Sequence, residues 1–311
     1  MNIAVDFGGT NIKIGLVEKG AIISKTSISA QSDTGLVKRL PVVKATIHEL
    51  LAQSGYTISE CSGIGMATPG LVDTDNQTIL SINDKYADAI GFSFFEWVSG
   101  AFSLPLVLEN DARAALIGET AYGVAQGETN AVLMTFGTGI GTAAIINDQI
   151  LRGRHYQAGI LGGHFTTNIN GPSCNCGNIG CLEAQSGSWA LEHQARQHVD
   201  FMGSRLAHAS EINYLTIVEA ARAGDRTSID LLEDLISNWS AGIVNLIHAY
   251  DPDVVILSGG LMKSKKIIVP LLEERVHRLA WTPWGKVRFM VADDPDTSVL
   301  LGVSRLLERK R

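Results

Sequence analysis

Apolar residues recur along the chain in short runs and in helical spacing, a pattern typical of a mixed α/β protein. Short apolar runs predict strands at 2–7, 11–18, 21–29, 62–67, 106–108, 253–257 and 287–291, and a strand hairpin at 130–147. Helical spacing predicts helices near 41–52, 94–102, 112–121, 182–196, 211–223, 228–250, 266–279 and 297–309. Residues 71–93 look polar and irregular, and 197–212 is the stretch with the weakest pattern.

The first two expected strands are joined by a turn that we call the first glycine turn, Gly8-Gly9-Thr10. Glycines let the backbone approach a ligand closely, and their amides can face phosphate oxygens. Asp6 stands at the strand end, where a carboxylate can hold Mg²⁺ through water, and Lys13 follows the turn. An ordinary hairpin is the competing interpretation of this turn taken alone.

A second copy of the pattern decides between these interpretations. In LMTFGTGIGTAAII, residues 133–146, Phe136 aligns with Phe7, and Gly137-Thr138-Gly139 forms the second glycine turn. Such a repeat predicts two related domains, each beginning with a phosphate-facing hairpin. The arrangement resembles the sugar kinase/actin/Hsp70 superfamily, in which ATP lies in a cleft between two duplicated α/β domains.

This resemblance implies duplicated actin-like, ribonuclease H-like ATPase domains with an interdomain cleft. We expect a small N-terminal domain at 1–118, joined by the C-terminal helix 297–311, and a large domain at 119–296. The large domain would carry a zinc loop at 164–181.

Composition supports a globular protein with a large core, because 45% of the 311 residues are hydrophobic and 18% are charged. A net charge of −7 argues against a nucleic-acid-binding surface. The chain starts directly in a strand, without a signal-peptide pattern, and no apolar run approaches ~18 residues. We therefore expect no membrane span, a cytoplasmic location and reduced thiols.

Three of the four cysteines lie close together, at Cys174, Cys176 and Cys181, with His164 shortly before them. In a reducing compartment, one histidine and three thiols at this spacing predict a tetrahedral zinc site. With no open ligand position, the zinc would be structural. The alternatives are coincidental thiols in a core or a disulfide. Cys61, beside an expected strand, reads as a small buried hydrophobe.

Taken together, the motifs resemble the ROK family of sugar kinases nearly from end to end. The family pattern combines a DxGGT hairpin, a PG motif, an E-N-D before a helix, a G-T-G-x-G hairpin, and G-H followed by C-x-C-G-x-x-G-C-x-E. In this chain the motifs stand as Asp6-Phe7-Gly8-Gly9-Thr10, Pro69-Gly70, Glu109-Asn110-Asp111, Gly137-Thr138-Gly139-Ile140-Gly141, Gly163-His164, and Cys174 to Glu183. The cysteine motif is highly specific, whereas glycine turns alone are not.

The resemblance implies phosphorylation of a hexose or hexose derivative by Mg-ATP, often at the 6-hydroxyl, and a homodimer. It makes Asp111 the general base, whereas an isolated Asn-Asp pair would read as a helix N-cap. The implied sugar contacts are Pro69, Gly70, Asn110, Asp111, His164 and Glu183. The implied nucleotide and Mg²⁺ residues are Asp6, Gly8, Gly9, Thr10, Lys13, Gly137, Thr138, Gly139, Gly259 and Gly260. The last two glycines follow a buried strand, where a plain tight loop is the alternative.

One position departs from the family pattern. The family usually has G-E-x-G-H, whose glutamate binds sugar hydroxyls, but this chain has Leu161 three residues before His164. A shift of one residue does not restore the carboxylate, because Ile160 is apolar too. The identity of the sugar is therefore open.

Two other functions compete with a kinase. A ROK transcriptional repressor would bind sugar and DNA through a winged helix before the first hairpin; this chain begins at the hairpin and is acidic, so we expect a kinase. A sugar-binding pseudokinase is made conceivable by Leu161, but Asp6, Asp111 and both glycine turns argue against it.

Overall fold

The computed structural model describes residues 1–82 and 85–309, which form two compact units. The first unit comprises Met1–Thr129, the short segment Asp148–Ala158, and the chain from Ala292 onward. The second comprises Asn130–Asn147 and Gly159–Val291. These boundaries differ from the expected one at 118, because helix α3 (Asp111–Tyr122) runs unbroken through that position. Residues 310 and 311 of the expected last helix lie outside the described residues.

The first unit is built on one mixed sheet in the order β3-β2-β1-β4-β7. Its strands are β1 (Asn2–Phe7), β2 (Asn11–Glu18), β3 (Ala21–Ser29), β4 (Ile64–Thr68) and β7 (Leu106–Asn110). β1 pairs antiparallel with β2 and parallel with β4, which in turn is parallel to β7. The three parallel strands therefore end at one edge, which gathers Asp6, Thr68 and Asn110.

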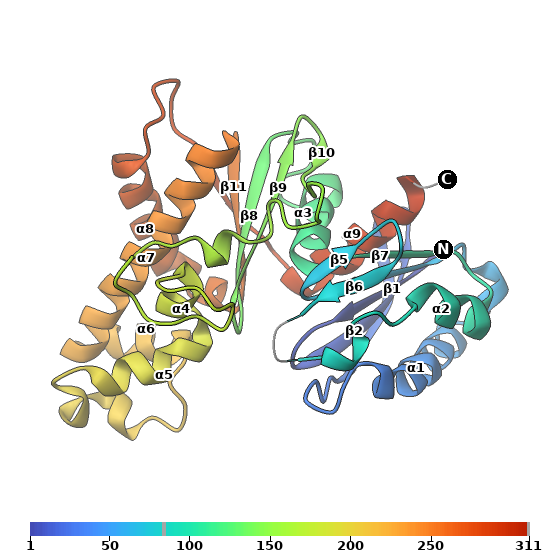
Figure 1. Cartoon of the computed structure of the whole chain (residues 1–311), viewed down its shortest axis with the longest axis horizontal. Helices are drawn as coiled ribbons and strands as arrows, with labels where there is room; N and C mark the ends of the chain where they lie inside the picture. Colours follow the sequence, from blue (N-terminus) through green and yellow to red (C-terminus); the bar gives the residue numbers. More distant parts are fainter. Residues whose placement is uncertain (83–84, 310–311) are drawn as a thin grey trace. The chain divides into compact units, whose positions relative to one another are not determined.

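Helices α1 (Leu40–Gln53), α2 (Phe94–Phe102), α3 and α9 (Pro295–Arg309) complete the first unit. In Figure 1, α9 at the red end of the chain lies beside α3 and the sheet of the first unit. Two glycines permit the close approach of α3 and α9: a Cβ on Gly118 would meet the Ser298 carbonyl, and one on Gly302 would meet the Ala114 carbonyl.

The second unit repeats this topology. Its sheet runs β9-β8-β11-β12, with β8 (Ala131–Phe136), β9 (Ile140–Ile146), β11 (Val254–Gly259) and β12 (Arg288–Val291). Again the hairpin pair is antiparallel, and the next two strands are parallel to its first strand. The expected α/β fold with a duplicated hairpin is thus confirmed.

The remaining helices of this unit are α4 (Leu182–Ser186), α5 (Ser188–Gln197), α6 (Tyr214–Arg222), α7 (Arg226–Tyr250) and α8 (Lys265–Leu279). The prediction of one helix at 182–196 is wrong, because Gly187 adopts an extended conformation and separates α4 from α5. A side chain at Gly187 would also crowd the Glu183 carbonyl.

Two further segments differ from expectation. The stretch 71–93 contains a small hairpin, β5 (Leu71–Asp73) and β6 (Thr78–Ser81), whose strands are too short to give a clear alternation. A two-residue strand, β10 (Gln149–Ile150), also follows the second hairpin, in a stretch where no element was predicted. Within the described residues, no helix has both the length and the apolar composition required to span a membrane.

Candidate active site and metal centre

The first glycine turn has its carbonyls bound and its amides bare. The Tyr86 hydroxyl donates to the Gly8 carbonyl at 2.8 Å, and the Ser32 hydroxyl donates to the Gly9 carbonyl at 2.7 Å. The amides of Gly8, Gly9 and Thr10 have no partner among the described residues. A turn that exposes N–H groups while its oxygens are occupied favours an anion.

A lysine that sequence reasoning did not identify lies against this turn. The Lys85 ammonium is 2.9 Å from where a Cβ on Gly9 would stand, so the absence of a side chain at Gly9 lets Lys85 lie close to the turn. Lys85 comes from a polar stretch without helical or strand periodicity, and no pattern linked it to the turn. It brings a positive charge to a turn that already favours anions.

Asp6, at the end of β1, shares a lysine with the last helix. Lys13 Nζ lies 3.2 Å from the Asp6 carboxylate and 2.8 Å from that of Asp296. Burial raises the pKa of Asp6 above its usual range, while the charge of Lys13 opposes the rise. Asp296 is 290 residues from Asp6 in the chain, and no sequence signal pairs them.

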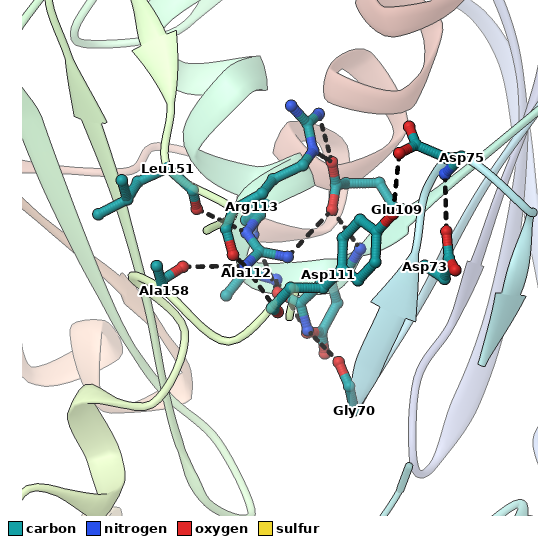
Figure 2. A network of polar contacts seen from close by, with 12 residues as sticks. Gly70, Asp73, Asp75, Glu109, Asp111, Ala112, Arg113, Leu151 and Ala158 are labelled. Atoms are coloured by element: carbon teal, nitrogen blue, oxygen red, sulfur yellow. Dashed lines mark hydrogen bonds and ion pairs between the residues drawn. The ribbon is translucent and has the colours of Figure 1, made fainter. Parts of the chain in front are cut away.

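The corner between β7 and α3 carries Asn110 and Asp111. Asn110 caps the helix, because its Oδ1 accepts from the amides of Ala112 and Arg113 at 3.0 and 3.2 Å. Its Nδ2 donates to the Gly70 carbonyl at 3.1 Å and to Asp111 Oδ1 at 3.0 Å. Figure 2 shows Gly70 directly beside this corner. The N-cap interpretation and a role in the site therefore both fit Asn110.

The Asp111 carboxylate is only partly satisfied by the protein. Oδ1 accepts from the Ala112 amide at 2.8 Å and from Asn110, whereas Oδ2 has no partner among the described residues. Burial raises the pKa of Asp111 to about 7, and the negative charge of Asp6 adds to the rise. A carboxyl group that titrates near neutrality with one free oxygen has the properties of a general base.

A charge cluster of Glu109, Arg113 and Arg152 lies next to this corner. Glu109 and Arg113 are fully buried, and Glu109 accepts from the Asn110 amide at 2.9 Å. Its other oxygen receives two hydrogen bonds from Arg152, at 2.9 and 2.6 Å. Figure 2 shows Glu109 and Arg113 within one continuous network around Asp111.

Arg113 fastens a segment that we call the strap, residues 148–158. Its guanidinium donates to the carbonyls of Leu151, Tyr156 and Ala158 at 3.0, 2.9 and 2.9 Å. Sequence reasoning missed Arg113 and Arg152, because an arginine on a helix or in a loop is usually a solvated residue. Only the structure reveals that the Arg113 side chain is buried.

Pro69 and Gly70 follow β4 at the same edge. Gly70 has a φ of +89°, and a side chain there would meet the Ser81 backbone, so only glycine fits. Thr68, just before them, has a buried hydroxyl with no hydrogen-bond partner among the described residues. Sequence reasoning did not single out this hydroxyl.

The second unit holds the second glycine turn beside Gly259. In the parallel pair of β8 and β11, Gly259 lies opposite Phe136, and a Cβ on Gly259 would meet the Phe136 carbonyl. The expected nucleotide-side glycines, Gly259 and Gly260, therefore lie next to the turn at Gly137–Gly139. Tight packing requires a glycine at 259, which has a φ of +91°.

His164, Cys174, Cys176 and Cys181 form a cluster whose ligand atoms all lie within 4.8 Å of one another. His164 Nδ1 is 3.6 Å from Cys174 Sγ, and Cys176 Sγ is 3.6 Å from Cys181 Sγ. A tetrahedral zinc with bonds of about 2.3 Å to sulfur places its ligand atoms about 3.8 Å apart. The four side chains therefore fit a zinc ion in type, number and spacing.

Glu183 lies two residues after the last cysteine and contacts the second glycine turn. Its Oε2 accepts from the Ile140 amide at 2.8 Å, and its Oε1 accepts from Trp189 Nε1 at 3.3 Å. Leu161 precedes the 3-10 turn Gly162–His164 and is half-buried, so no carboxylate stands at that position.

Each unit thus gathers its own part of the expected site. The first unit brings together Asp6, Gly8, Gly9, Thr10, Lys13, Pro69, Gly70, Asn110 and Asp111. The second unit brings together Gly137, Thr138, Gly139, Gly259, Gly260, His164, Glu183 and the three cysteines.

Known proteins resemble the chain over its whole length. A solved ROK family glucokinase from Streptomyces griseus, in complex with glucose and AMPPNP, is 27% identical with a TM-score of 0.81 over 99% of both chains. A glucokinase from Thermotoga maritima is 30% identical over 285 residues, 88% of this chain and 86% of that protein.

Regulators are also among the relatives. A xylose repressor from Bacillus subtilis is 26% identical over 239 residues, which are 77% of this chain and 59% of the repressor. The family model that matches residues 2–310 carries the description "ROK family". Because this match spans nearly the whole sequence and agrees with the fold and the motifs, the chain belongs to the ROK family.

Proposed function

We propose that the protein is an ATP-dependent sugar kinase that phosphorylates a hexose or hexose derivative at the 6-hydroxyl. The observation that carries this proposal is the Asp111 corner, where a carboxyl group with a pKa of about 7 keeps one oxygen free of protein partners. Membership of the ROK family and the relatives named glucokinase support the same reaction.

In this mechanism Asp111 accepts the proton of the sugar hydroxyl as the hydroxyl oxygen attacks the γ-phosphorus. The bond between the γ-phosphorus and the β,γ-bridging oxygen breaks, and ADP leaves. Asn110 holds the Asp111 carboxylate through Oδ1, which leaves Oδ2 to face the hydroxyl. Phosphoryl transfer needs positioning and charge neutralisation more than covalent chemistry. Lys13 and Lys85 supply positive charge beside the first glycine turn.

The nucleotide would be held by backbone amides. In both glycine turns carbonyls are bound by neighbouring groups, so the bare amides are free for phosphate oxygens. Gly259 and Gly260 extend the second turn. Asp6 is the carboxylate that would hold Mg²⁺ through water, and the ion would neutralise charge on the phosphates.

Sugar contacts are assigned to the Pro69–Gly70 backbone, Asn110, Asp111, His164 and Glu183. His164 faces the cysteines through Nδ1, so its Nε2 remains for a sugar hydroxyl. The zinc loop (164–181) would bind one structural zinc and so fix His164. A homodimer is part of the proposal on the strength of the family resemblance, and the acidic charge supports the absence of a nucleic-acid partner.

Leu161 bears on the choice of sugar. An apolar side chain where a carboxylate would accept hydrogen bonds leaves hydroxyl groups of the sugar unpaired. Either the enzyme is a poor kinase for plain hexoses, with a high KM, or its substrate carries an apolar or altered group there. Acetamido, deoxy and glycosidic groups are of this kind.

The second candidate function is a sugar-binding regulator or pseudokinase without kinase activity. The repressor relative favours it, because 77% of this chain aligns with a protein named xylose repressor. A coupled ADP-release assay with glucose, fructose, mannose, N-acetylglucosamine and N-acetylmannosamine distinguishes the candidates. Sugar-dependent ADP release supports the kinase, whereas sugar binding by calorimetry without ADP release supports the regulator.

A further inference from the structure

The second glycine turn is held from two sides by helices α4 and α5. The Thr138 carbonyl accepts from the Trp189 amide and from the Ser188 hydroxyl, both at 3.3 Å, at the start of α5. The Ile140 amide donates to Glu183 Oε2 at 2.8 Å, at the start of α4. The amides of Thr138 and Gly139 are left without a partner among the described residues.

The Glu183 carboxylate contacts the backbone of the second glycine turn directly. Its carboxylate lies so near Gly139 that any side chain at that position would collide with it. Ile140 is buried, so loss of the carboxylate would remove a hydrogen-bond acceptor from the backbone of a buried residue. The indole of Trp189 donates to the other carboxylate oxygen and holds the side chain in place.

Helix α4, which carries Glu183, is held in place by hydrogen bonds and by packing. The Ser186 carbonyl at its end accepts from the Tyr214 hydroxyl at 2.7 Å and from Trp239 Nε1 at 3.2 Å. Leu182 is fully buried and packs where Gly242 of α7 has no side chain. Cys181, a member of the metal-ligand cluster, directly precedes this helix.

We infer that Glu183 is a positioning residue for the second glycine turn and links the zinc loop to the nucleotide-facing backbone. The inference rests on the proposed function, which assigns this turn to phosphates. It gives Glu183 a task that does not depend on the sugar: the carboxylate fixes the Ile140 amide so that the amides of Thr138 and Gly139 remain available to an anion. Order in the zinc loop would then affect nucleotide binding.

The test is binding of Mg-AMPPNP without sugar, measured by calorimetry on the full chain. Glu183→Ala should weaken the Kd at least 10-fold, and Glu183→Gln, which keeps an acceptor oxygen, should weaken it less. The matched control is Glu192→Gln on α5, whose carboxylate pairs with Arg196 on the surface; it should bind as the wild type does. A residue that only contacted sugar would leave AMPPNP binding unchanged, and that result would overturn the inference.

A second measurement keeps the test independent of nucleotide binding. Amide hydrogen exchange of the peptide that contains Ile140 should be faster in Glu183→Ala than in the control variant. In the wild type, exchange of this peptide should also become faster when the metal is removed. Unchanged exchange in a folded Glu183→Ala protein would overturn the inference. Absence of sugar-dependent ADP release in the wild type would refute the proposed function, while this exchange test would still decide the role of Glu183.

Discussion

At the scale of single residues, the environment of Asp111 sets the pH at which its carboxyl group ionises. Burial and the charge of Asp6 raise its pKa to about 7, and a general base is active only when ionised. We therefore expect kcat/KM to rise with pH up to about 7 and to level off above it. Asp6→Asn removes one of the two causes and should move the midpoint to lower pH. A flat pH profile between 5 and 8 would exclude Asp111 as the group that titrates.

The raised pKa of Asp111 also predicts how the stability of the protein depends on pH. Because the folded pKa lies above the unfolded value of about 3.9, ionisation of Asp111 lowers the free energy of unfolding as pH rises from about 4 to 7. Each unit of the shift corresponds to about 1.4 kcal/mol. Asp111→Asn should therefore be more stable than the wild type at pH 8, with a difference that shrinks toward pH 4. Urea unfolding at several pH values measures this, and equal stability at pH 8 would contradict it.

Asp6 has a distinct role in the account, as the carboxylate that would hold magnesium. Asp6→Asn should raise the Mg²⁺ concentration needed for half-maximal activity, because the negative group that would face the ion is gone. Titration of activity with Mg²⁺ at fixed ATP measures this. Asp296→Asn is the comparison, since Asp296 contacts Lys13 but is exposed. An unchanged magnesium requirement in Asp6→Asn would count against the assignment.

We propose that Leu161 influences which sugar the enzyme accepts. A hydrogen bond to a charged group contributes about 1.5–3 kcal/mol, which corresponds to roughly 10- to 150-fold in affinity. Leu161→Glu should therefore raise kcat/KM for glucose by up to this factor, and Leu161→Gln should raise it less. A sugar panel run on all three proteins measures this. A micromolar KM for glucose in the unmutated enzyme, with no gain in the Glu variant, would show that the position is misassigned.

At the scale of elements, the charge cluster behind Asp111 has a measurable consequence. Removing one partner of a buried ion cluster costs up to about 3–5 kcal/mol, and water near the partly exposed Arg152 should keep the cost at the lower end. Arg152→Gln should therefore lower the urea midpoint and reduce kcat, because Glu109 also holds the Asn110 amide. Arg154→Gln, an exposed change in the same strap, is the control. Equal midpoints for both variants would contradict the role of the cluster.

Most strands and helices were predictable because their buried residues recur with the spacing of apolar residues that is typical of a strand or a helix. β1 and β4 are completely buried, and β2 carries buried apolar side chains at alternate positions, Ile12, Ile14 and Leu16, so all three strands appear in the hydrophobic pattern. The break between α4 and α5 was missed, because a single glycine in an otherwise helical pattern is often tolerated. β5 and β6 were missed because each is only a few residues long.

The site was predictable only where its residues belong to local motifs. Several parts of the site are short local motifs whose residue types indicate their chemistry. They are Asp6, the two glycine turns, the Asn110–Asp111 corner and the cysteine cluster. Lys85, Asp296 and Arg152 reach their positions through tertiary packing, which no local pattern encodes. The pairing of Glu109 with Arg152 depends on how the strap returns to the first unit.

At the scale of the whole molecule, two units with the same strand topology each contribute a glycine turn. The common plan explains why one alignment of Phe7 with Phe136 was enough to predict the duplicated fold. The cleft between the domains, the homodimer and the cytoplasmic location stay predictions. Light scattering on the purified protein would decide the oligomeric state.

The central claim is that this molecule transfers phosphate from ATP to a sugar with Asp111 as the base. The most direct test compares wild type and Asp111→Asn in the ADP-release assay at pH 8, with the best sugar from the panel. We predict sugar-dependent ADP release by the wild type and a fall of roughly 10²–10⁴-fold in turnover for Asp111→Asn. AMPPNP binding should persist in the variant. Undiminished turnover by Asp111→Asn, or no sugar-dependent ADP release by the wild type, would contradict the account.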